Sequence, residues 1–186
     1  MIPPALRSLM TAEELFQLPT DDYKYELAEG ELIRRPPTGA THGNVSVRVG
    51  RLLDEYVEAH DLGIVCGAET GFILQRTPDV VRAPDVAFVA KDRIPATGVP
   101  EPYWPFAPDL AVEVVSPSDR VDDLQAKVGE YFTAGTRLVW VIHPRSRTVF
   151  VYRSPHDVRA LGETDELSSA DVLPGFSCRV SRCFTS

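Results

Sequence analysis

Apolar residues recur at two different periods along the chain, and the period separates predicted helices from predicted strands. Over residues 42–60 they recur at helical spacing, which predicts an amphipathic helix of about five turns at 3.6 residues each. Two runs rich in β-branched residues, 80–90 and 109–115, are bounded by proline and predict buried strands. The next apolar stripe runs over 116–135, with a capping serine and a proline at its start and a glycine at its end, and predicts a second long helix.

Shorter patterns predict the remaining elements. Thr11 and Glu14 have the spacing of a capping box and predict a short helix that stops before Pro19. Segments 23–27 and 31–34 flank a glycine turn and predict a β-hairpin. We expect further strands at 63–66 and 69–74, forming a meander with 80–90, and a second hairpin from 137–142 and 148–152. This order predicts the α/β (α+β) class, with a mixed central β-sheet flanked by helices in a single domain over 1–186.

Residues 91–108 interrupt these periods. They contain five prolines together with Tyr103, Trp104 and Phe106, so regular structure is not expected there. A loop of this length inside a compact domain is often functional. Three aromatic side chains are difficult to leave in water, so we expect the loop to be poorly ordered or to pack against another chain.

Two carboxylates, Asp85 and Glu113, interrupt the most apolar runs. An unpaired buried carboxylate costs several kcal/mol, about 2 to 7 even for a neutral polar group, so a compensating charge is expected. Two oxygen ligands on neighbouring strands suit a hard cation such as Mg²⁺. Alternation along 109–115 turns Glu113 away from the fully apolar face, and Lys127 lies at the edge of the next helix's apolar stripe. On spacing alone, a purely structural ion pair with Lys127 or Arg82 fits equally well.

Charge and cysteine content narrow the class of protein. The chain has 19 Lys and Arg against 27 Asp and Glu, a formal charge of -8, which argues against a broad nucleic-acid-binding surface but allows a local basic groove. Three cysteines without a Cys-x-x-Cys pair exclude a disulfide scaffold and a zinc ribbon, and they favour a reducing cytoplasm. Residues 1–10 lack an apolar signal core, and no apolar run is long enough to cross a bilayer. A cytoplasmic protein without membrane contact is therefore expected.

A series of short motifs follows in a specific order from about Thr11 to Phe176. The motifs are Tyr25-Glu26-Leu27, Gly30-Glu31-Leu32, His42-Gly43, Pro84-Asp85-Val86, the run from Pro108 to Ser118, Lys127, Tyr131, Gly135, Trp140 and Leu173-Pro174-Gly175-Phe176. In that order they resemble the Uma-type putative restriction endonuclease family, which implies a restriction-endonuclease-like core similar to the PD-(D/E)XK nuclease fold.

The resemblance implies roles for three residues. Asp85 matches the family's metal-binding aspartate, and Glu113 matches the acidic residue of the E-x-K element, so both are expected to bind Mg²⁺, with Mn²⁺ as a substitute. The superfamily's lysine usually lies two residues after that glutamate, where this chain has Val115. Lys127 is the matching position from which the family replaces it. A lysine from another element can still stabilise phosphate charge or orient water, because only the location of its ammonium matters.

Glu69 and His42 are second-rank candidates. Glu69 is expected to begin a strand next to Asp85 and to extend the carboxylate set, although a glutamate at a strand start is more often solvated. His42, at the start of the helix, is expected to contact phosphate or orient a ligand, although such a histidine is more often a surface or capping residue.

The sequence thus favours a Mg²⁺-dependent DNA endonuclease with Asp85, Glu113 and Lys127 as its catalytic residues. DNA is the expected substrate, and a homodimer or higher homo-oligomer is expected because a duplex needs two cuts. The alternative is a non-catalytic module that keeps the nuclease fold to bind nucleic acid or a protein partner. The acidic total and Val115 favour that alternative.

Overall fold

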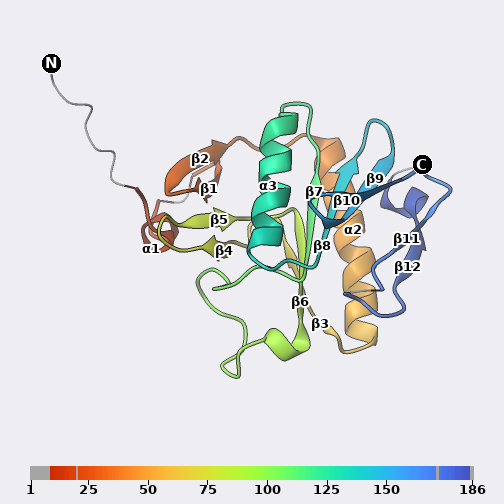
Figure 1. Ribbon diagram of the computed structural model, residues 1–186, viewed down its shortest axis with the longest axis horizontal. Coiled ribbons are helices and arrows are strands. Elements are labelled where there is room, and N and C mark those ends of the chain that lie inside the picture. Colours follow the sequence, from red (N-terminus) through yellow and green to blue (C-terminus); the bar gives the residue numbers. More distant parts are fainter. Residues whose placement is uncertain (1–8, 20, 171, 185–186) are drawn as a thin grey trace, which may run out of the picture.

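The structure is a computed structural model that describes residues 9–19, 21–170 and 172–184. The expectation that residues 1–10 lack a signal core falls mostly on residues 1–8, which lie outside the described residues. Its elements follow the chain as Figure 1 shows. They are α1 (Ala12–Phe16), β1 (Lys24–Ala28), β2 (Glu31–Arg35), α2 (Ala40–Ala59), β3 (Gly63–Gly67), β4 (Phe72–Gln75), β5 (Val80–Arg82), β6 (Val86–Ala90), the 3-10 turn η1 (Lys91–Arg93), β7 (Leu110–Val114), α3 (Val121–Thr133), β8 (Leu138–His143), β9 (Thr148–Ser154), β10 (Asp157–Leu161), β11 (Glu166–Ser168), β12 (Ser177–Arg179) and the 3-10 turn η2 (Val180–Cys183).

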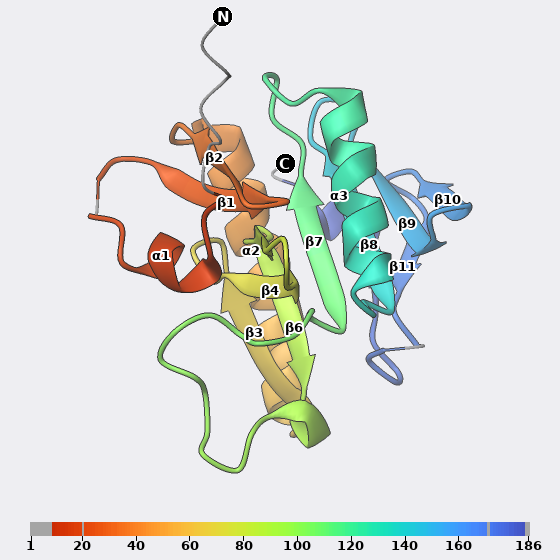
Figure 2. The ribbon, with the colours of Figure 1, turned by 60° about the vertical axis from the view of Figure 1, so that its left-hand side comes forward.

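The larger sheet is mixed, as the sequence predicted. Within the described residues it has six strands in the order β10-β9-β8-β7-β6-β3. β7 and β8 run parallel and are joined by α3, whereas the other neighbours are antiparallel. Strands β6 to β8 lie between α2 and α3 (Figure 2). The α+β class with a mixed sheet flanked by helices is confirmed.

Period-two alternation along β7 explains how the two helices share this sheet. Leu110, Val112 and Val114 belong to the apolar core on the α2 side, whereas Ala111 packs with Val128 of α3. Glu113 therefore lies on the α3 side, as the pattern predicted. β7 therefore presents the Glu113 carboxylate to α3, the helix that carries Lys127.

A second sheet, in the order β2-β1-β5-β4, corrects the prediction for 80–90. The run is two strands: β5 pairs with β1 and β4, whereas β6 pairs with β3 and β7. Pro84 lacks a backbone N–H and cannot continue a ladder between two neighbours, so the chain leaves one sheet there and enters the other. The predicted meander is wrong, and Asp85 lies at the junction of the two sheets.

The start of α3 was also predicted too early. The helix begins at Val121, with Arg120 as its N-cap, and not at Ser116. The Asp119 carboxylate accepts a hydrogen bond from the Ser116 N–H at 2.8 Å, and the Asp119 N–H donates to the Ser116 carbonyl at 3.1 Å. This local turn satisfies the backbone groups that a helical turn would have used. The C-terminal end is confirmed, because Gly135 follows α3 with φ 98°.

The aromatic residues of 91–108 pack against their own domain. Trp104 is fully buried, stacks near Phe72 and forms a β-bridge with it. Phe106 is partly buried against Trp104, and Tyr103 packs edge-on against Phe16. The loop folds back over β4 and supplies its own apolar contacts, so the expectation that these side chains are poorly ordered is wrong. Packing of the partly buried Tyr103 and Phe106 against another chain stays a prediction.

The other short elements agree with their patterns. The Thr11 hydroxyl and the Glu14 carboxylate form the capping box of α1, and the β1–β2 hairpin turns through Gly30 at φ 77°. The strand predicted at 69–74 begins only at Phe72. No helix among the described residues is long and apolar enough to cross a membrane.

Candidate active site

A pocket of about 380 Å³ opens where the two larger sheets approach α2 and α3. All five residues that the sequence singled out lie in its wall: Asp85, Glu113, Lys127, His42 and Glu69. They come from the β5–β6 junction, β7, α3, α2 and the turn after β3. The fold therefore brings together candidates that are far apart in the sequence.

Asp85 is held by groups from three elements. The Val114 N–H donates to its Oδ2 at 2.8 Å, and His42 Nε2 lies 3.1 Å from the same oxygen. The Lys24 ammonium lies 3.8 Å from Oδ1. Burial alone would raise the pKa of this carboxyl, but the hydrogen bond from His42 and the charge of Lys24 outweigh it and lower the pKa. Asp85 is therefore ionised and fixed in direction.

His42 contacts the carboxylate itself. Burial lowers the pKa of the imidazole, but the hydrogen bond and the charge of Asp85 outweigh burial and raise the pKa overall. A nearly buried histidine at this distance from a carboxylate orients that carboxylate and adds positive charge beside it. The expectation of a solvated surface histidine does not apply to this position.

Glu113 is bound by two residues of α3. The Tyr131 hydroxyl donates to its Oε1 at 2.7 Å, and Lys127 Nζ lies 3.3 Å from Oε1 and 3.2 Å from Oε2. Burial raises the pKa of the Glu113 carboxyl, the Lys127 charge opposes that shift, and the charges of Asp85 and Glu26 add to it, so the net shift is upward. Negative charge at Glu113 is therefore only partly compensated.

Lys127 is a buried ammonium shared by two carboxylates. Its Nζ lies 3.1 Å from Glu26 Oε1 in addition to its contacts with Glu113. Burial alone would lower the pKa of the lysine, but the charges of Glu113 and Glu26 outweigh it and raise the pKa. Lys127 therefore remains charged inside the protein.

Glu26 fixes this lysine from the neighbouring sheet. Its Oε1 also accepts the Ala83 N–H at 3.1 Å, and its Oε2 lies 3.3 Å from Arg82 Nη1 and 3.3 Å from Arg35 Nε. Burial alone would raise the pKa of the Glu26 carboxyl, but the charges of Lys127 and Arg82 lower it to about 2. This carboxylate is permanently ionised and joins β1, β2, β5 and α3.

Arg82 belongs to this network and not to the metal candidates. Its Nε and Nη2 donate to the two oxygens of Glu130 at 2.5 and 2.8 Å, a bidentate pair that ties β5 to α3. The structural pairing of Lys127 with Glu113, which the sequence left open, is thus present, whereas Arg82 pairs with Glu26 and Glu130.

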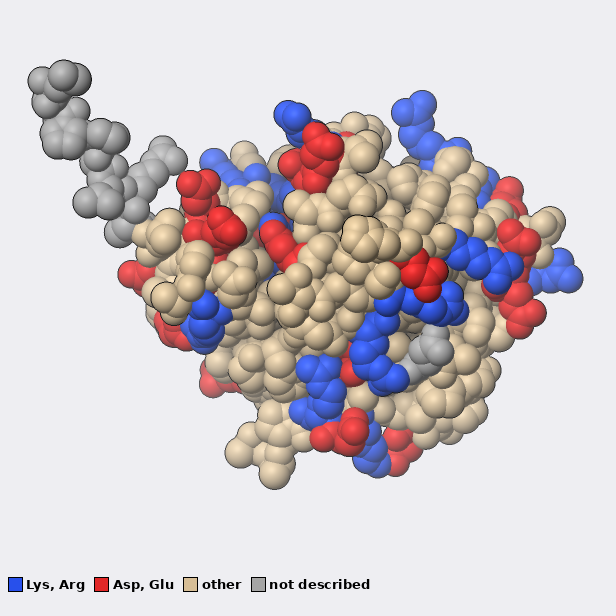
Figure 3. Space-filling view, viewed as in Figure 1, with Lys and Arg blue, Asp and Glu red and all other residues tan. Residues whose placement is uncertain are grey.

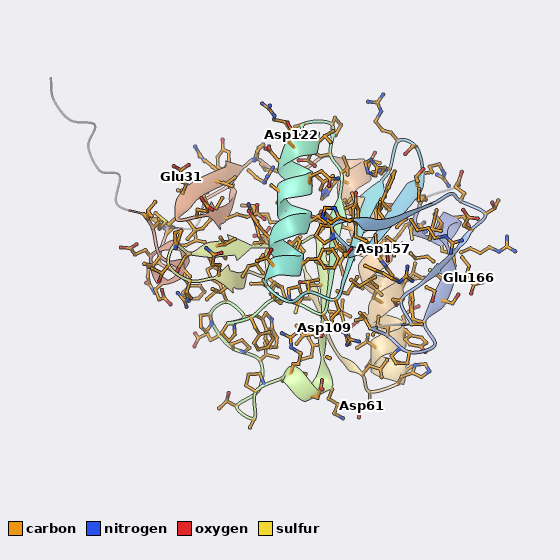
Figure 4. The ribbon with its side chains drawn as sticks, in the orientation of Figure 1. Glu31, Asp61, Asp109, Asp122, Asp157 and Glu166 are labelled. Carbon is orange, nitrogen blue, oxygen red and sulfur yellow. The ribbon has the colours of Figure 1, made fainter. Side chains whose placement is uncertain are left out.

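Two further acidic residues, Glu69 and Asp109, lie outside the buried cluster of Asp85, Glu113 and Lys127. Glu69 is exposed in the turn after β3, so the prediction that it begins a strand is wrong, although it lies at the rim of the pocket. Asp109 shares the alternation of Glu113 but lies at the opposite end of β7 (Figure 4), where it accepts the Ala90 N–H at 2.9 Å and pairs with Arg93 at 3.1 Å.

Sequence reasoning assigned no role to Glu26 or Tyr131, although both lie in the motifs of the resemblance. The spacing of Tyr131, one turn after Lys127, already placed its hydroxyl on the same helix face. Glu26 gave no such signal, since a charged residue in a predicted hairpin normally faces solvent. Its burial depends on β5 and α3, which approach β1 only in the folded chain.

The pocket combines two carboxylates of different acidity with a buried ammonium. Carboxylate oxygens are hard donors that favour hard cations, and a fixed ammonium stabilises anionic charge that develops beside it. Among the described residues, no group of three or more His, Cys, Asp or Glu side chains has the arrangement of a metal site.

Comparisons with known proteins show the fold and the family of this chain. A solved structure, described as a putative nuclease belonging to DUF820 from Anabaena variabilis ATCC 29413, has the same fold with a TM-score of 0.82; it is 20% identical, over 94% of this chain and 97% of that chain. No protein with a curated description matches the sequence. The family model Uma2, putative restriction endonuclease, matches residues 12–181. The chain therefore belongs to the Uma2 family of putative restriction endonucleases.

Proposed function

We propose that the protein is a metal-dependent DNA endonuclease in which Asp85 and Glu113 bind Mg²⁺ and Lys127 assists hydrolysis of the phosphodiester bond. One observation carries the proposal. Lys127 Nζ lies 3.2 Å from Glu113 Oε2 in the pocket that also contains Asp85, so α3 supplies the ammonium that the strand lacks at Val115.

The donor set fits Mg²⁺ better than a structural zinc ion. Mg²⁺ is usually bound by one or two carboxylates and completes its shell with water and substrate phosphate, whereas zinc sites in proteins use three or four side chains. Asp85 and Glu113 supply two nearly buried carboxylates, and the charge of Asp85 contributes to the raised pKa of Glu113. A divalent cation between them would remove that repulsion.

The surrounding residues have separate tasks in this proposal. Asp85 is fixed in direction by His42 and the Val114 N–H, and Glu113 by Tyr131, so both carboxylates are oriented before a cation arrives. A bound Mg²⁺ would lower the pKa of water and screen the phosphate. Lys127 would stabilise the negative charge that increases on the phosphate oxygens as the bond breaks.

Cleavage of supercoiled plasmid with Mg²⁺ or Mn²⁺ tests the proposal, with Asp85→Ala and Glu113→Gln as the variants. Both should lose cleavage and metal uptake by calorimetry. Asp157→Ala, which removes an exposed carboxylate on β10 at the far edge of the sheet, should keep both. Wild-type protein that takes up metal but cuts no DNA would favour the binding module. Sedimentation of the same protein tests the homodimer.

A further inference from the structure

The wall of the pocket formed by α2 continues into a second hollow. This hollow has a volume of about 350 Å³ and is lined by Val47, Arg48, Arg51 and Leu52 of α2 and by Arg182 of η2. Val47 also lines the candidate active site. The two hollows therefore meet at this exposed valine, and a chain leaving the pocket along α2 would next meet three arginines.

Charge favours this exit over the others. Five carboxylates, four of them exposed, line the remaining rim of the pocket: Asp21, Asp22, Glu69, Asp119 and Asp123. On the α2 side the lining residues after His42 are uncharged, namely Gly43, Ser46 and Val47. The first turn of α2 carries no acidic residue. These carboxylates repel a polyanion along that part of the rim, which also carries Lys24, Arg35 and Arg120. On α2, by contrast, no acidic side chain lies between His42 and Leu53.

The arginines of this hollow have weak partners. Arg48 Nε donates to the amide oxygen of Asn44 at 3.2 Å, which leaves its charge uncompensated by that contact. Arg51 pairs with Glu55 at 3.3 Å, but both side chains are more than half exposed, and such surface pairs contribute little. On the face that Figure 3 shows, basic and acidic side chains are interspersed. Arg48 and Arg51 can therefore exchange their contacts for phosphate at small cost.

We propose that Arg48, Arg51 and Arg182 bind the phosphodiester backbone of the DNA strand whose scissile phosphate occupies the candidate active site. The inference rests on the proposed function, because the position of the cut phosphate fixes which nucleotides lie along α2. Nine residues separate His42 from Arg51, about 14 Å along a helix at 1.5 Å per residue. Measured along the axis of B-form DNA, that length corresponds to about four phosphates of one strand, at a rise of about 3.4 Å per nucleotide. The arginines thus bind phosphates about four nucleotides from the cut and position the strand without reading its sequence.

Equilibrium binding of a fluorescent DNA duplex of about 20 base pairs tests the inference, measured by anisotropy in EDTA over about 50 to 200 mM salt. The variant is Arg48→Ala/Arg51→Ala. Its matched control is Arg145→Ala/Arg159→Ala, which removes two exposed arginines near the far edge of the sheet. Loss of two phosphate contacts should weaken binding about tenfold and reduce the slope of log K against log salt by about 2. The control should stay within about twofold of wild type.

Each result decides the inference. Equal weakening of both double variants would reduce it to a net-charge effect, and unchanged binding of the α2 variant would overturn it. Displacement of the duplex by polyglutamate at equal charge concentration would assign the surface to acidic polypeptides instead. Because no bond is cleaved in EDTA, failure of the metal-site proposal would leave these outcomes unaffected, and Asp85→Ala should bind the duplex at least as tightly as wild type.

Discussion

Glu26 and Glu113 are two buried carboxylates that share Lys127, yet their acidities are shifted in opposite directions. Glu26 is surrounded by Lys127 and Arg82, together with Arg35 and a backbone N–H, and its pKa is lowered to about 2. Glu113 has the same lysine and one phenol, and its pKa is raised by burial. Glu26 thus anchors the fold, whereas the negative charge of Glu113 is only partly compensated by Lys127 and Tyr131. A cation would bind at this second carboxylate.

The largest effect is expected from Glu26→Gln. The amide would leave the buried charges of Lys127 and Arg82 undercompensated, which costs about 3 kcal/mol or more of unfolding free energy. Glu113→Gln should cost much less, because burial already opposes the charged form of Glu113 and raises its pKa. Urea unfolding of both variants, with Glu31→Gln on the exposed side of β2 as control, makes the comparison. Equal losses for Glu26→Gln and Glu113→Gln would contradict the division into anchor and site.

Lys127→Ala is expected to slow metal-dependent DNA cleavage by roughly a hundredfold, the scale of removing one electrostatic stabiliser. Metal affinity should remain nearly intact, since Lys127 is not a ligand in this account. Lys127→Met keeps most of the side-chain volume and separates loss of charge from loss of packing. Single-turnover cleavage and calorimetry on both variants measure the two quantities. Full activity in either variant would remove the lysine from catalysis.

Tyr131→Phe should have a smaller effect. The change removes the hydrogen bond to Glu113 Oε1 and keeps the ring that packs against Val128. A hydrogen bond to a charged group contributes about 1.5 to 3 kcal/mol, so we expect a loss of stability in that range and a roughly tenfold loss of cleavage from a less oriented carboxylate. The stability loss should diminish when Mn²⁺ is present. A purely structural tyrosine would lose stability equally with and without Mn²⁺.

The smallest effect is a difference in pH dependence. Because the folded pKa of Glu26 is lowered to about 2, its ionisation stabilises the fold above the usual glutamate range, and that contribution is lost as pH falls toward about 2. The folded pKa of Glu113 is raised, so its neutral form stabilises the fold at low pH and the contribution is lost as pH rises above the usual range. Relative to wild type, Glu26→Gln should recover stability on acidification, and Glu113→Gln should gain stability as pH rises. Parallel pH profiles of the two variants would oppose the comparison.

The sequence predicted what depends on neighbours along the chain and missed what depends on distant charges. Alternation in β7 placed Glu113 on the α3 side, and the helical stripe brought Lys127 to it. The contact between Lys127 and Glu26 joins residues 101 positions apart, and no local period reports it. The late start of α3 did have a local signal, the Asp119 carboxylate three residues after Ser116, which favours a turn over a helix.

The position of Asp85 shows a second limit. Its apolar surroundings predicted burial correctly, but a continuous strand hid the change of sheet at Pro84. The packing of Trp104 under its own loop was missed for a similar reason, since proline content reports the absence of regular structure and not the absence of a core. Burial can be predicted from composition, whereas the partner that buries a side chain cannot.

The most direct test of the account is the anomalous difference map of crystals grown with Mn²⁺. A shared ion predicts one peak that lies within about 2.0 to 2.6 Å of an oxygen of Asp85 and of an oxygen of Glu113, which brings these oxygens within about 5 Å of each other. Lys127 should remain beside Glu113 without touching the ion. A Mn²⁺ peak on other residues, or a map without a peak at this pair while the protein still cleaves DNA with Mn²⁺, would contradict the claim that Asp85 and Glu113 form the metal site.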